Sequence, residues 1–340
     1  MKIVVTGGAS FIGSHLVDRL LVDEHQVVCV DDFSSGSWLN IAEAREHKNF
    51  KVLTIDLRTA SVCRIARALH NVDLVYHLAA DHGGRGYVQL HQVNCSNNFA
   101  IDNNVFQACV LAKVPKIIYA SSGCVYPVDL QDDTSHIVNL REEDLGPPYN
   151  PDGLYGMAKL VGEMTLEHMY QEYNMQSVSC RFFTVYGPRA KENHAIISFI
   201  ARAFIQQDPF VFWGDGTAIR NWTYVDDIIE GLILAQDISG CTSLNLGTME
   251  HQTVTDAINK VLSLAQGLWY PSYAPMLIAD TTMPVGPLCR VADNAKYLSL
   301  GGKPSTPFAT GLVDTMDWYF KTHDIKAVAR DFDRLLIARK

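Results

Sequence analysis

The sequence predicts an α/β protein: a doubly wound parallel sheet with a smaller C-terminal substrate-binding domain. Three observations support this class. Short apolar runs recur along the chain, helical stretches separate them, and a glycine-rich turn follows the first run. Runs that are apolar throughout are typical of strands buried on both faces of a sheet. With 340 residues, 48% of them hydrophobic, the chain can build such a core in one large domain or two interlocked ones.

The expected elements alternate between strand and helix. Strands are expected at 2–5, 26–32, 50–57, 72–80, 116–122 and 177–187, and helices at 12–21, 98–112, 253–265 and 307–323. Residues 327–340 are expected to form a final helix or a tail ordered by a partner. Because ligands bind beyond the carboxyl ends of parallel strands, the polar residues that end each strand are the first candidates for function.

Composition excludes several classes of function. The formal charge of −9 argues against a broad nucleic-acid surface. No apolar run reaches membrane-spanning length, and the chain starts directly with a strand, so neither a membrane span nor a signal peptide is expected. The eight cysteines form no Cys-x-x-Cys pair or metal-like cluster, which predicts a reduced, cytoplasmic protein without a metal site.

The turn after the first strand, VVTGGASFIG (4–13), nearly matches a dinucleotide-binding loop with three glycines. Gly7 and Gly13 occupy the first and last of these positions, where glycine permits a tight turn and close packing of helix on strand. Ser10 stands at the middle position, and its small side chain still leaves room for a pyrophosphate at the start of the helix. The stretch therefore predicts a Rossmann-type nucleotide site.

The next two strands end in acids that extend this site. Asp31 ends the second strand, close to the distance at which an acid binds the adenosine ribose hydroxyls. A carboxylate there repels a 2′-phosphate, so NAD is expected rather than NADP. Asp56 and Leu57 end the third strand and are expected to hold the adenine.

Tyr155 and Lys159, in LYGMAKL, are four residues apart and would share one face of a helix. The lysine and a cationic nicotinamide ring would both lower the pKa of the phenol. We therefore expect Tyr155 to act as a general base near neutral pH.

Together these stretches resemble the extended short-chain dehydrogenases/reductases of the nucleotide-sugar epimerase and dehydratase group, from Met1 to about Asp293. The matching motifs are TGGASFIGSH, HLAA, SSGCVYP, YGMAK, RFFTVYGPR, WGDGTAIRNWTYVDD and RVAD. The resemblance implies NAD as cofactor, a GDP- or UDP-linked sugar as substrate, and a homodimer formed by the helices that carry Asn98 and Tyr155. It also implies an NAD-binding domain at 1–176, with a return around 215–250, and a mainly sugar-nucleotide-binding part at 177–340.

The resemblance implies two sets of contact residues. Those for the cofactor are Gly7, Ser10, Phe11, Ile12, Gly13, Asp31, Asp56, Leu57, Leu78, Ala79, Ala80, Asn98, Tyr155 and Lys159. Those for the substrate are Gly83, Gly84, Ser122, Thr184, Lys191, Trp213, Arg220 and Arg290. The two arginines would grip the diphosphate, and Asn98 would support the active-site backbone.

Within the group, AADHGGRGY (79–87) and SSGCVYP resemble the GDP-mannose 3,5-epimerases in their paired glycines and in Cys124. His194 falls where those enzymes have a lysine facing the cysteine across the sugar. RFFTVYGP, with Thr184, looks more like the UDP-glucuronate 4-epimerases. In those enzymes an arginine near the position of Lys191 holds the uronate carboxylate.

The implied reaction is epimerisation through a transient 4-keto sugar. Tyr155 takes the 4-hydroxyl proton while hydride leaves C4 for NAD⁺, and Ser122 hydrogen-bonds the developing ketone. The ketone acidifies the hydrogens at C3 and C5, and Cys124 and His194 can exchange such protons near neutral pH. Because position 124 follows Ser122 by two residues, its side chain is expected on the same face of the strand.

Other reactions stay open at this point. A UDP-uronate 4-epimerase needs only Tyr155 and a sugar that can swing about its diphosphate. A dehydratase needs an acid for the leaving hydroxyl, and no Asp-Glu pair follows Ser122. A decarboxylase usually has glutamate at position 124. A non-catalytic NAD-binding sensor is expected to lack the Tyr/Lys pair, which is intact here.

Overall fold

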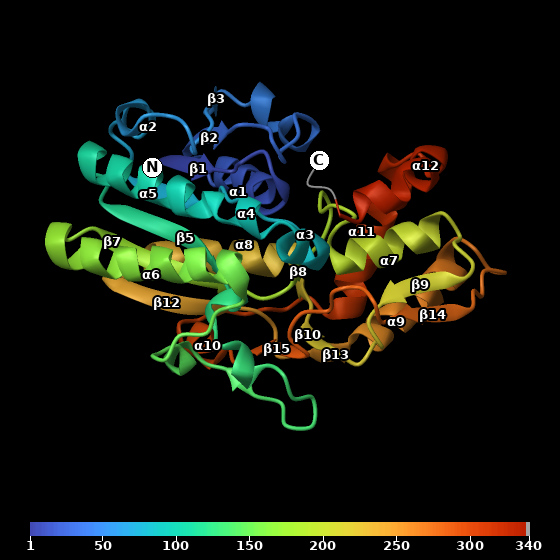
Figure 1. Ribbon diagram of the computed structural model, residues 1–340. Coiled ribbons are helices and arrows are strands. Elements are labelled where there is room, and N and C mark those ends of the chain that lie inside the picture. The colour runs from blue at the N-terminus through green and yellow to red at the C-terminus, as the bar shows by residue number, and fades with distance from the viewer. Residues whose placement is uncertain (338–340) are drawn as a thin grey trace.

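The computed structural model describes residues 1–337 and centres on a seven-stranded sheet whose strands are all parallel (Figure 1). The strands lie in the order β12-β7-β5-β4-β1-β2-β3. Their bounds are β1 Lys2–Thr6, β2 Gln26–Asp31, β3 Phe50–Thr54, β4 Leu74–His77, β5 Lys116–Ser122, β7 Gln176–Phe182 and β12 Cys241–Leu246. The predicted doubly wound sheet is confirmed, and its order reverses at β1, where such folds bind their ligands.

Helices cover both faces of this sheet because alternate strand residues point to opposite sides. On one side, Ile3 and Val5 of β1 share a core with Leu16 of α1 (Phe11–Val22), and α8 (Val225–Leu234) packs beside α1. On the other side, Val4 belongs to a core with Val105. That side is covered by α2 (Val62–Ala68), α5 (Asn97–Ala112) and α6 (Gly153–Tyr173).

The C-terminal half adds smaller sheets beside the main one (Figure 1). A four-stranded sheet joins β13 (His251–Thr253), β10 (Ile219–Asn221), β15 (Cys289–Ala292) and β6 (Asn139–Leu140). Two further pairs are β8 (Val185–Tyr186) with β11 (Thr223–Tyr224), and β9 (Phe210–Trp213) with β14 (Leu277–Asp280).

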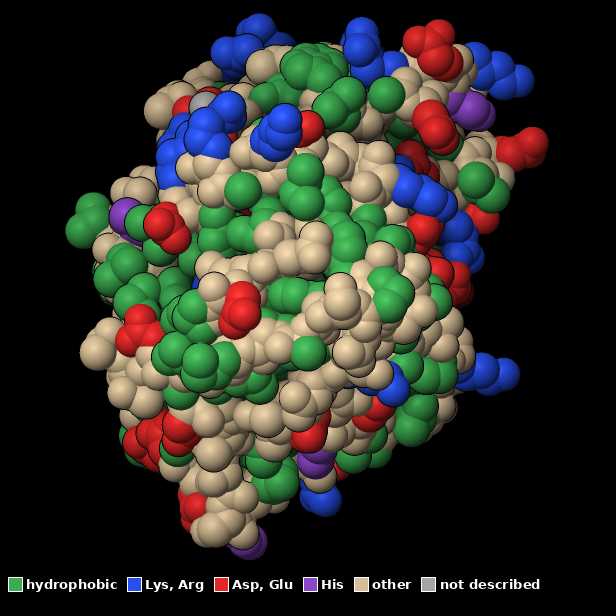
Figure 2. All heavy atoms as spheres, turned by 90° about the vertical axis from the view of Figure 1, so that its right-hand side faces the viewer, with side chains coloured by type: hydrophobic (Ala, Val, Ile, Leu, Met, Phe, Trp, Pro, Cys, Tyr) green, Lys and Arg blue, Asp and Glu red, His purple; other side chains and the backbone are tan. Residues whose placement is uncertain are grey.

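The remaining helices connect and flank these sheets. They are α3 (Arg85–Leu90), α4 (Gln92–Cys95), α7 (Ala195–Phe204), α9 (Val254–Leu268), α10 (Ala295–Ser299), α11 (Phe308–Thr322) and α12 (Ile325–Leu335). The face that this half forms carries apolar side chains scattered among acidic and basic ones (Figure 2). Within residues 1–337, no helix combines the length and the apolar character that a membrane crossing requires.

Several expected elements differ from the structure at their ends. The strands expected at 50–57 and 72–80 stop at Thr54 and His77, because the residues that follow leave the sheet and line a cavity. The strand expected at 177–187 is divided into β7 and β8. Of the helix expected at 327–340, α12 covers the part up to Leu335, and residues 338–340 lie outside the described residues.

Candidate active site

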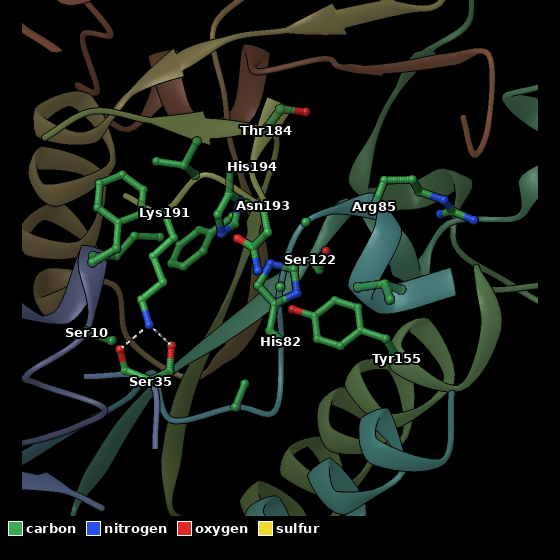
Figure 3. A pocket seen from close by; sticks show the side chains of 18 of the residues that line it. Ser10, Ser35, His82, Arg85, Ser122, Tyr155, Thr184, Lys191, Asn193 and His194 are labelled. Carbon is green, nitrogen blue, oxygen red and sulfur yellow. Dashed lines mark hydrogen bonds between the residues drawn. The ribbon is translucent and has the colours of Figure 1, made fainter. Parts of the chain in front are cut away.

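A cavity of about 420 Å³ lies where the carboxyl ends of the main strands meet the C-terminal half (Figure 3). Residues that follow β1 to β5 line it, together with the loops after β7 and β8. All of the predicted cofactor, substrate and catalytic residues line this one cavity except Asn98. Residues from distant parts of the sequence therefore converge at the sheet edge where α/β proteins bind ligands.

The glycine loop requires glycine at positions 7 and 13, because a side chain at either would clash with the backbone. A Cβ at Gly13 would lie 2.1 Å from the carbonyl oxygen of Gly7, and a Cβ at Gly7, whose φ is +70°, would lie 2.8 Å from the backbone nitrogen of Ala79. The Ser10 hydroxyl donates to the Gly7 carbonyl and so closes the turn in place of the usual middle glycine. Helix α1 begins at the next residue, and its first N–H groups are suited to a phosphate.

Asp31 is fixed at the wall of the cavity by backbone donors. Its carboxylate accepts from the N–H of Ala9 at 3.0 Å and from the N–H of Phe33 at 2.8 Å. Asp56 is held differently, because Arg58 donates to both of its oxygens. This hydrogen bonding lowers the pKa of Asp56. Arg58, which also lines the cavity, is a site residue that the sequence reasoning missed.

Lys159 has an unmet need for polar partners in the cavity wall. Its Nζ is buried and has no hydrogen-bond partner among residues 1–337. The nearest carboxylate oxygen, on Asp102, lies 4.0 Å away. Burial lowers the pKa of Lys159, which Asp102 partly offsets. A buried ammonium group in a cavity wall calls for polar ligand atoms, and the hydroxyls of a nicotinamide ribose satisfy that need.

Tyr155 lies one helical turn before Lys159 on α6 and is buried in the wall of the same cavity. Burial raises the pKa of Tyr155, and the neighbouring Cys124 adds to this increase. The expected lowering of that pKa is wrong for the chain by itself. Desolvation of the phenolate outweighs the hydrogen bond with Ser122, which acts in the opposite direction.

Cys124 does not lie on the catalytic strand. Strand β5 ends at Ser122, and Cys124 sits in a short 3₁₀ turn, Gly123–Val125, with its N–H donating to the Ser122 hydroxyl at 3.1 Å. The argument from alternation along a strand is therefore wrong, although the side chain does line the cavity. Arg290 donates to the sulfur at 3.0 Å and so fixes the position of the side chain in the cavity wall.

His194 precedes helix α7 and is joined to Tyr155 through a second imidazole. The ring of His82 stacks on Tyr155, with 4.7 Å between centroids, and lies 5.7 Å from the ring of His194 (Figure 3). Burial and the charge of Lys191 lower the pKa of His194 to about 4. His82 was not predicted from the sequence, although it belongs to the stretch AADHGGRGY, whose glycines were singled out.

The paired glycines after β4 have a structural explanation. A Cβ at Gly84 would lie 1.6 Å from the carbonyl oxygen of Asn193, and a Cβ at Gly83 would lie 2.9 Å from the side-chain nitrogen of Asn193. The glycines therefore allow the loop after β4 to contact the loop at 191–194. This contact brings His82 and His194 together.

Three arginines meet at the far end of the cavity. Arg85 and Arg290 both donate to Asp152, at 2.6 and 2.8 Å. Arg220 donates to the backbone carbonyls of Ile219, Val285, Pro287 and Leu288. Burial lowers the pKa of Arg220 to about 9, and the two other arginines add to this effect. Arg85, which sequence reasoning missed, makes three cations around one carboxylate, an arrangement suited to a diphosphate.

Three further predicted residues lie apart from these clusters. Asn98 is buried and binds the backbone N–H and carbonyl of Asp81, so it supports the loop after β4. Trp213 packs its ring edge against Gly86 at the start of α3. Thr184 lines the cavity between β7 and β8.

Lys191 points toward Ser10 and Ser35, and its Nζ donates to the carbonyl and hydroxyl oxygens of Ser35 at 2.6 and 3.2 Å (Figure 3). The resemblance implied that Lys191 would contact a carboxylate of the sugar, but the side chain points toward Ser35 and away from Tyr155 (Figure 3).

No group of three or more histidine, cysteine or acidic side chains is arranged to hold a metal ion in the part of the chain that the structure describes. The cavity has one end lined by residues from Gly7 to Asp56 and an arginine-rich end lined by Arg85, Arg220 and Arg290.

Comparison with known proteins identifies related chains. Residues 3–247 match the model of the NAD dependent epimerase/dehydratase family. The chain is 30% identical over 329 residues to GDP-mannose 3,5-epimerase of Arabidopsis thaliana, which spans 94% of this chain and 82% of that protein. It is 34% identical over 278 residues to an uncharacterized UDP-glucose epimerase, YtcB, of Bacillus subtilis, with 79% and 82% covered.

A solved structure with the same fold contains both ligands. The UDP-glucuronic acid 4-epimerase of Bacillus cereus, in complex with UDP-glucuronic acid and NAD, superposes with a TM-score of 0.81 and 28% sequence identity. The match covers 96% of this chain and 100% of that one.

Proposed function

Because this chain belongs to the NAD-dependent epimerase/dehydratase family and its cofactor is NAD, we propose that it is a nucleotide-sugar epimerase of the 3,5-epimerase type. It converts its substrate through a transient 4-keto sugar and inverts C3 or C5 before the hydride returns to C4. The substrate is a GDP- or UDP-linked sugar, held by its diphosphate.

One observation carries this proposal. Cys124 and His194, which lie far apart in the sequence, line the same cavity as Tyr155, and His82 joins His194 to Tyr155 through ring contacts. Inversion beside a ketone requires one group that removes a proton and another that supplies one. A thiol next to a guanidinium and a neutral imidazole form a suitable pair.

Each remaining residue has a defined task. NAD, held by the residues around Gly7, Gly13 and Asp31, would supply the site that takes up the C4 hydride and returns it. Tyr155 removes the proton of the 4-hydroxyl, and Ser122, at the end of β5, donates to the oxygen as the ketone forms. Lys159 is buried one turn from Tyr155, and its ammonium group, which has no hydrogen-bond partner among residues 1–337, would donate to the ribose hydroxyls of bound NAD.

The arginine-rich end of the cavity supports a diphosphate substrate. Arg85, Arg220 and Arg290 contribute three positive charges, and Asp152 offsets one of them. The two remaining charges match the two negative charges of a sugar-nucleotide diphosphate. Tight binding at the diphosphate would leave the sugar ring beside Tyr155, where both Cys124 and His194 can reach it.

A second candidate is a UDP-uronate 4-epimerase. Thr184 in the cavity wall and the similarity to the solved UDP-glucuronic acid 4-epimerase favour it. The direction of Lys191 disfavours it, because this side chain extends toward Ser35 and not toward Tyr155.

Incubation with a panel of GDP-, UDP- and dTDP-sugars in deuterated water tests the proposal. A 3,5-type epimerase incorporates solvent deuterium at C3 or C5, which mass spectrometry and NMR detect. Epimerisation at C4 without any deuterium on carbon would instead identify the second candidate. Net release of water or carbon dioxide would replace both with a dehydratase or decarboxylase.

We further propose that different parts of the chain bind NAD and the sugar nucleotide, and that the protein forms a homodimer. Residues 1–176, with β7, β12 and α8 from the second half, would hold NAD, and the rest of residues 177–340 would mainly hold the sugar nucleotide. The dimer would form through α5 and α6. The eight cysteines are all free thiols, in keeping with a cytoplasmic protein.

A further inference from the structure

The loop at 191–194 lines the cavity and contacts three separate elements. Lys191 donates to Ser35 in the loop after β2. Glu192 accepts from the hydroxyl of Tyr319 on α11 at 2.8 Å. The carbonyl of Asn193 lies directly against Gly84 in the loop after β4. A loop attached at both sides of a cavity is positioned to cover what the cavity holds.

Lys191 and His194 leave this loop in different directions. His194 lies near His82 and so faces the end of the cavity that contains Tyr155 (Figure 3). Lys191 extends toward Ser10 and Ser35, at the end where helix α1 begins (Figure 3). The lysine therefore serves the dinucleotide end of the cavity, and the histidine serves the sugar end.

The dinucleotide end needs positive charge from outside the glycine loop. NAD carries two negative charges on its pyrophosphate, whereas a helix N-terminus supplies only about half of one positive charge. The Ser10 hydroxyl is engaged with the Gly7 carbonyl. Lys191 donates to Ser35, and the neighbouring Gly36 packs closely against Ala9 of the glycine loop. Its ammonium group can therefore supply the missing charge.

We propose that Lys191 holds the cofactor: its ammonium group binds the pyrophosphate of NAD and fastens the loop at 191–194 over the bound dinucleotide. The hydride taken from C4 must return to the same sugar, so the cofactor has to stay in place through the whole cycle. A positively charged tether from the substrate-binding half supplies that retention, and it links cofactor binding to the position of His194.

The test compares Lys191→Met with Lys191→Arg in the purified protein. The control is Lys321→Met, which removes an exposed lysine paired with Asp317 on α11. Bound NAD per chain is measured, and its dissociation is followed by exchange with isotope-labelled NAD. Loss of a charge-assisted hydrogen bond should speed NAD release by about 10- to 100-fold in Lys191→Met. Lys191→Arg and the control should stay close to the wild type.

A second measurement locates the effect on the cofactor. The dissociation constant of ADP-ribose, which contains the pyrophosphate, should rise in Lys191→Met. The dissociation constant of adenosine, which lacks the pyrophosphate, should not change. These measurements need no sugar nucleotide, so they hold whichever reaction the enzyme catalyses. Unchanged NAD release in Lys191→Met, or an equal loss in Lys191→Met and Lys191→Arg, would overturn the proposal. If Lys191→Met only raised the KM for carboxylated sugars, Lys191 would contact the substrate and not the cofactor, and the proposal would be wrong.

Discussion

At the scale of the residue, Tyr155 shows how strongly burial controls the chemistry. Its pKa is raised in the chain alone, so the phenol holds its proton until positive charge is nearby. Tyr155→Phe keeps the ring but removes the acid–base group. We expect hydride transfer to be abolished, seen as no transient NADH absorbance on mixing with substrate, while sugar-nucleotide binding by calorimetry stays nearly intact. Turnover near the wild-type rate would remove Tyr155 from the mechanism.

Cys124 and His194 are predicted to act after the ketone forms. Cys124→Ser and His194→Ala should therefore still oxidise C4 but lose deuterium exchange at C3 or C5. General acid–base groups contribute about 10²- to 10⁴-fold, so the loss is easily measured. Serine retains an acceptor for Arg290, which separates proton transfer from packing. If both variants epimerise a UDP-uronate normally, the 4-epimerase is the correct assignment.

The pH dependence of exchange provides a separate test of His194. Its pKa is lowered from 6.5 to about 4, so the imidazole stays neutral as the pH falls from neutral toward that value. Exchange should decline near the lower value and not near 6.5, and the small residual exchange of His194→Ala should lack this decline. The same shift makes the folded state lose stability from pH 6.5 downward, because the unfolded imidazole takes up the proton first. Circular dichroism must therefore confirm folding at each pH, and a decline centred near 6.5 in folded protein would contradict the assignment.

At the scale of the element, the contact between the loop after β4 and the loop at 191–194 depends on Gly84. A Cβ there would lie 1.6 Å from the carbonyl oxygen of Asn193, which is backbone and cannot rotate away. Gly84→Ala should destabilise the protein by about 1–3 kcal/mol and displace His194 from His82. Urea unfolding and the exchange assay measure the two effects.

Gly267→Ala is the matched control, because no atom lies within 4 Å of its Cβ position near the end of α9. This change should be neutral or slightly stabilising, since alanine favours a helix. Equal stability and activity of Gly84→Ala and Gly267→Ala would show that the loops do not interlock as described.

The strands of the main sheet were predictable where their runs are apolar throughout. Strand β5 has the bounds expected from the sequence, 116–122, because it is buried among neighbours on both sides. Strand β12 was not expected. It lies at the sheet edge and begins with Cys241, Thr242 and Ser243, which are partly exposed, so no apolar run reveals it.

The candidate site was predictable where a motif fixes both residue type and spacing. Asp31 ends a strand and Tyr155 precedes Lys159 by one turn, so local rules place them. His82 lies in the loop after β4 and Arg85 begins α3, and neither belongs to a motif with fixed spacing. Their partners, Tyr155 and Asp152, lie about a fifth of the chain away, and only the tertiary structure brings them together.

At the scale of the whole molecule, α6 presents two different surfaces. Tyr155 and Lys159 face the cavity, whereas Leu154, Met157, Val161 and Met164 are exposed at spacings of three and four residues. Such spacing places the four apolar side chains on one stripe of the helix. An apolar stripe on the outside of an otherwise packed helix indicates a contact with another protein surface. A second copy of α6 would cover it.

Replacing Val161 with lysine at the centre of this stripe should therefore convert a dimer into a monomer. A buried, unpaired ammonium group in an apolar interface costs several kcal/mol, and the charge would be duplicated across the two-fold axis. Size-exclusion chromatography with light scattering measures the mass. Met276→Lys, at an exposed apolar residue before β14, is the control and should leave the mass unchanged. Because the stripe and the cavity lie on different sides of α6, Val161→Lys should keep its bound NAD. A wild-type protein that is itself monomeric, or a Val161→Lys variant that stays dimeric, would exclude this interface.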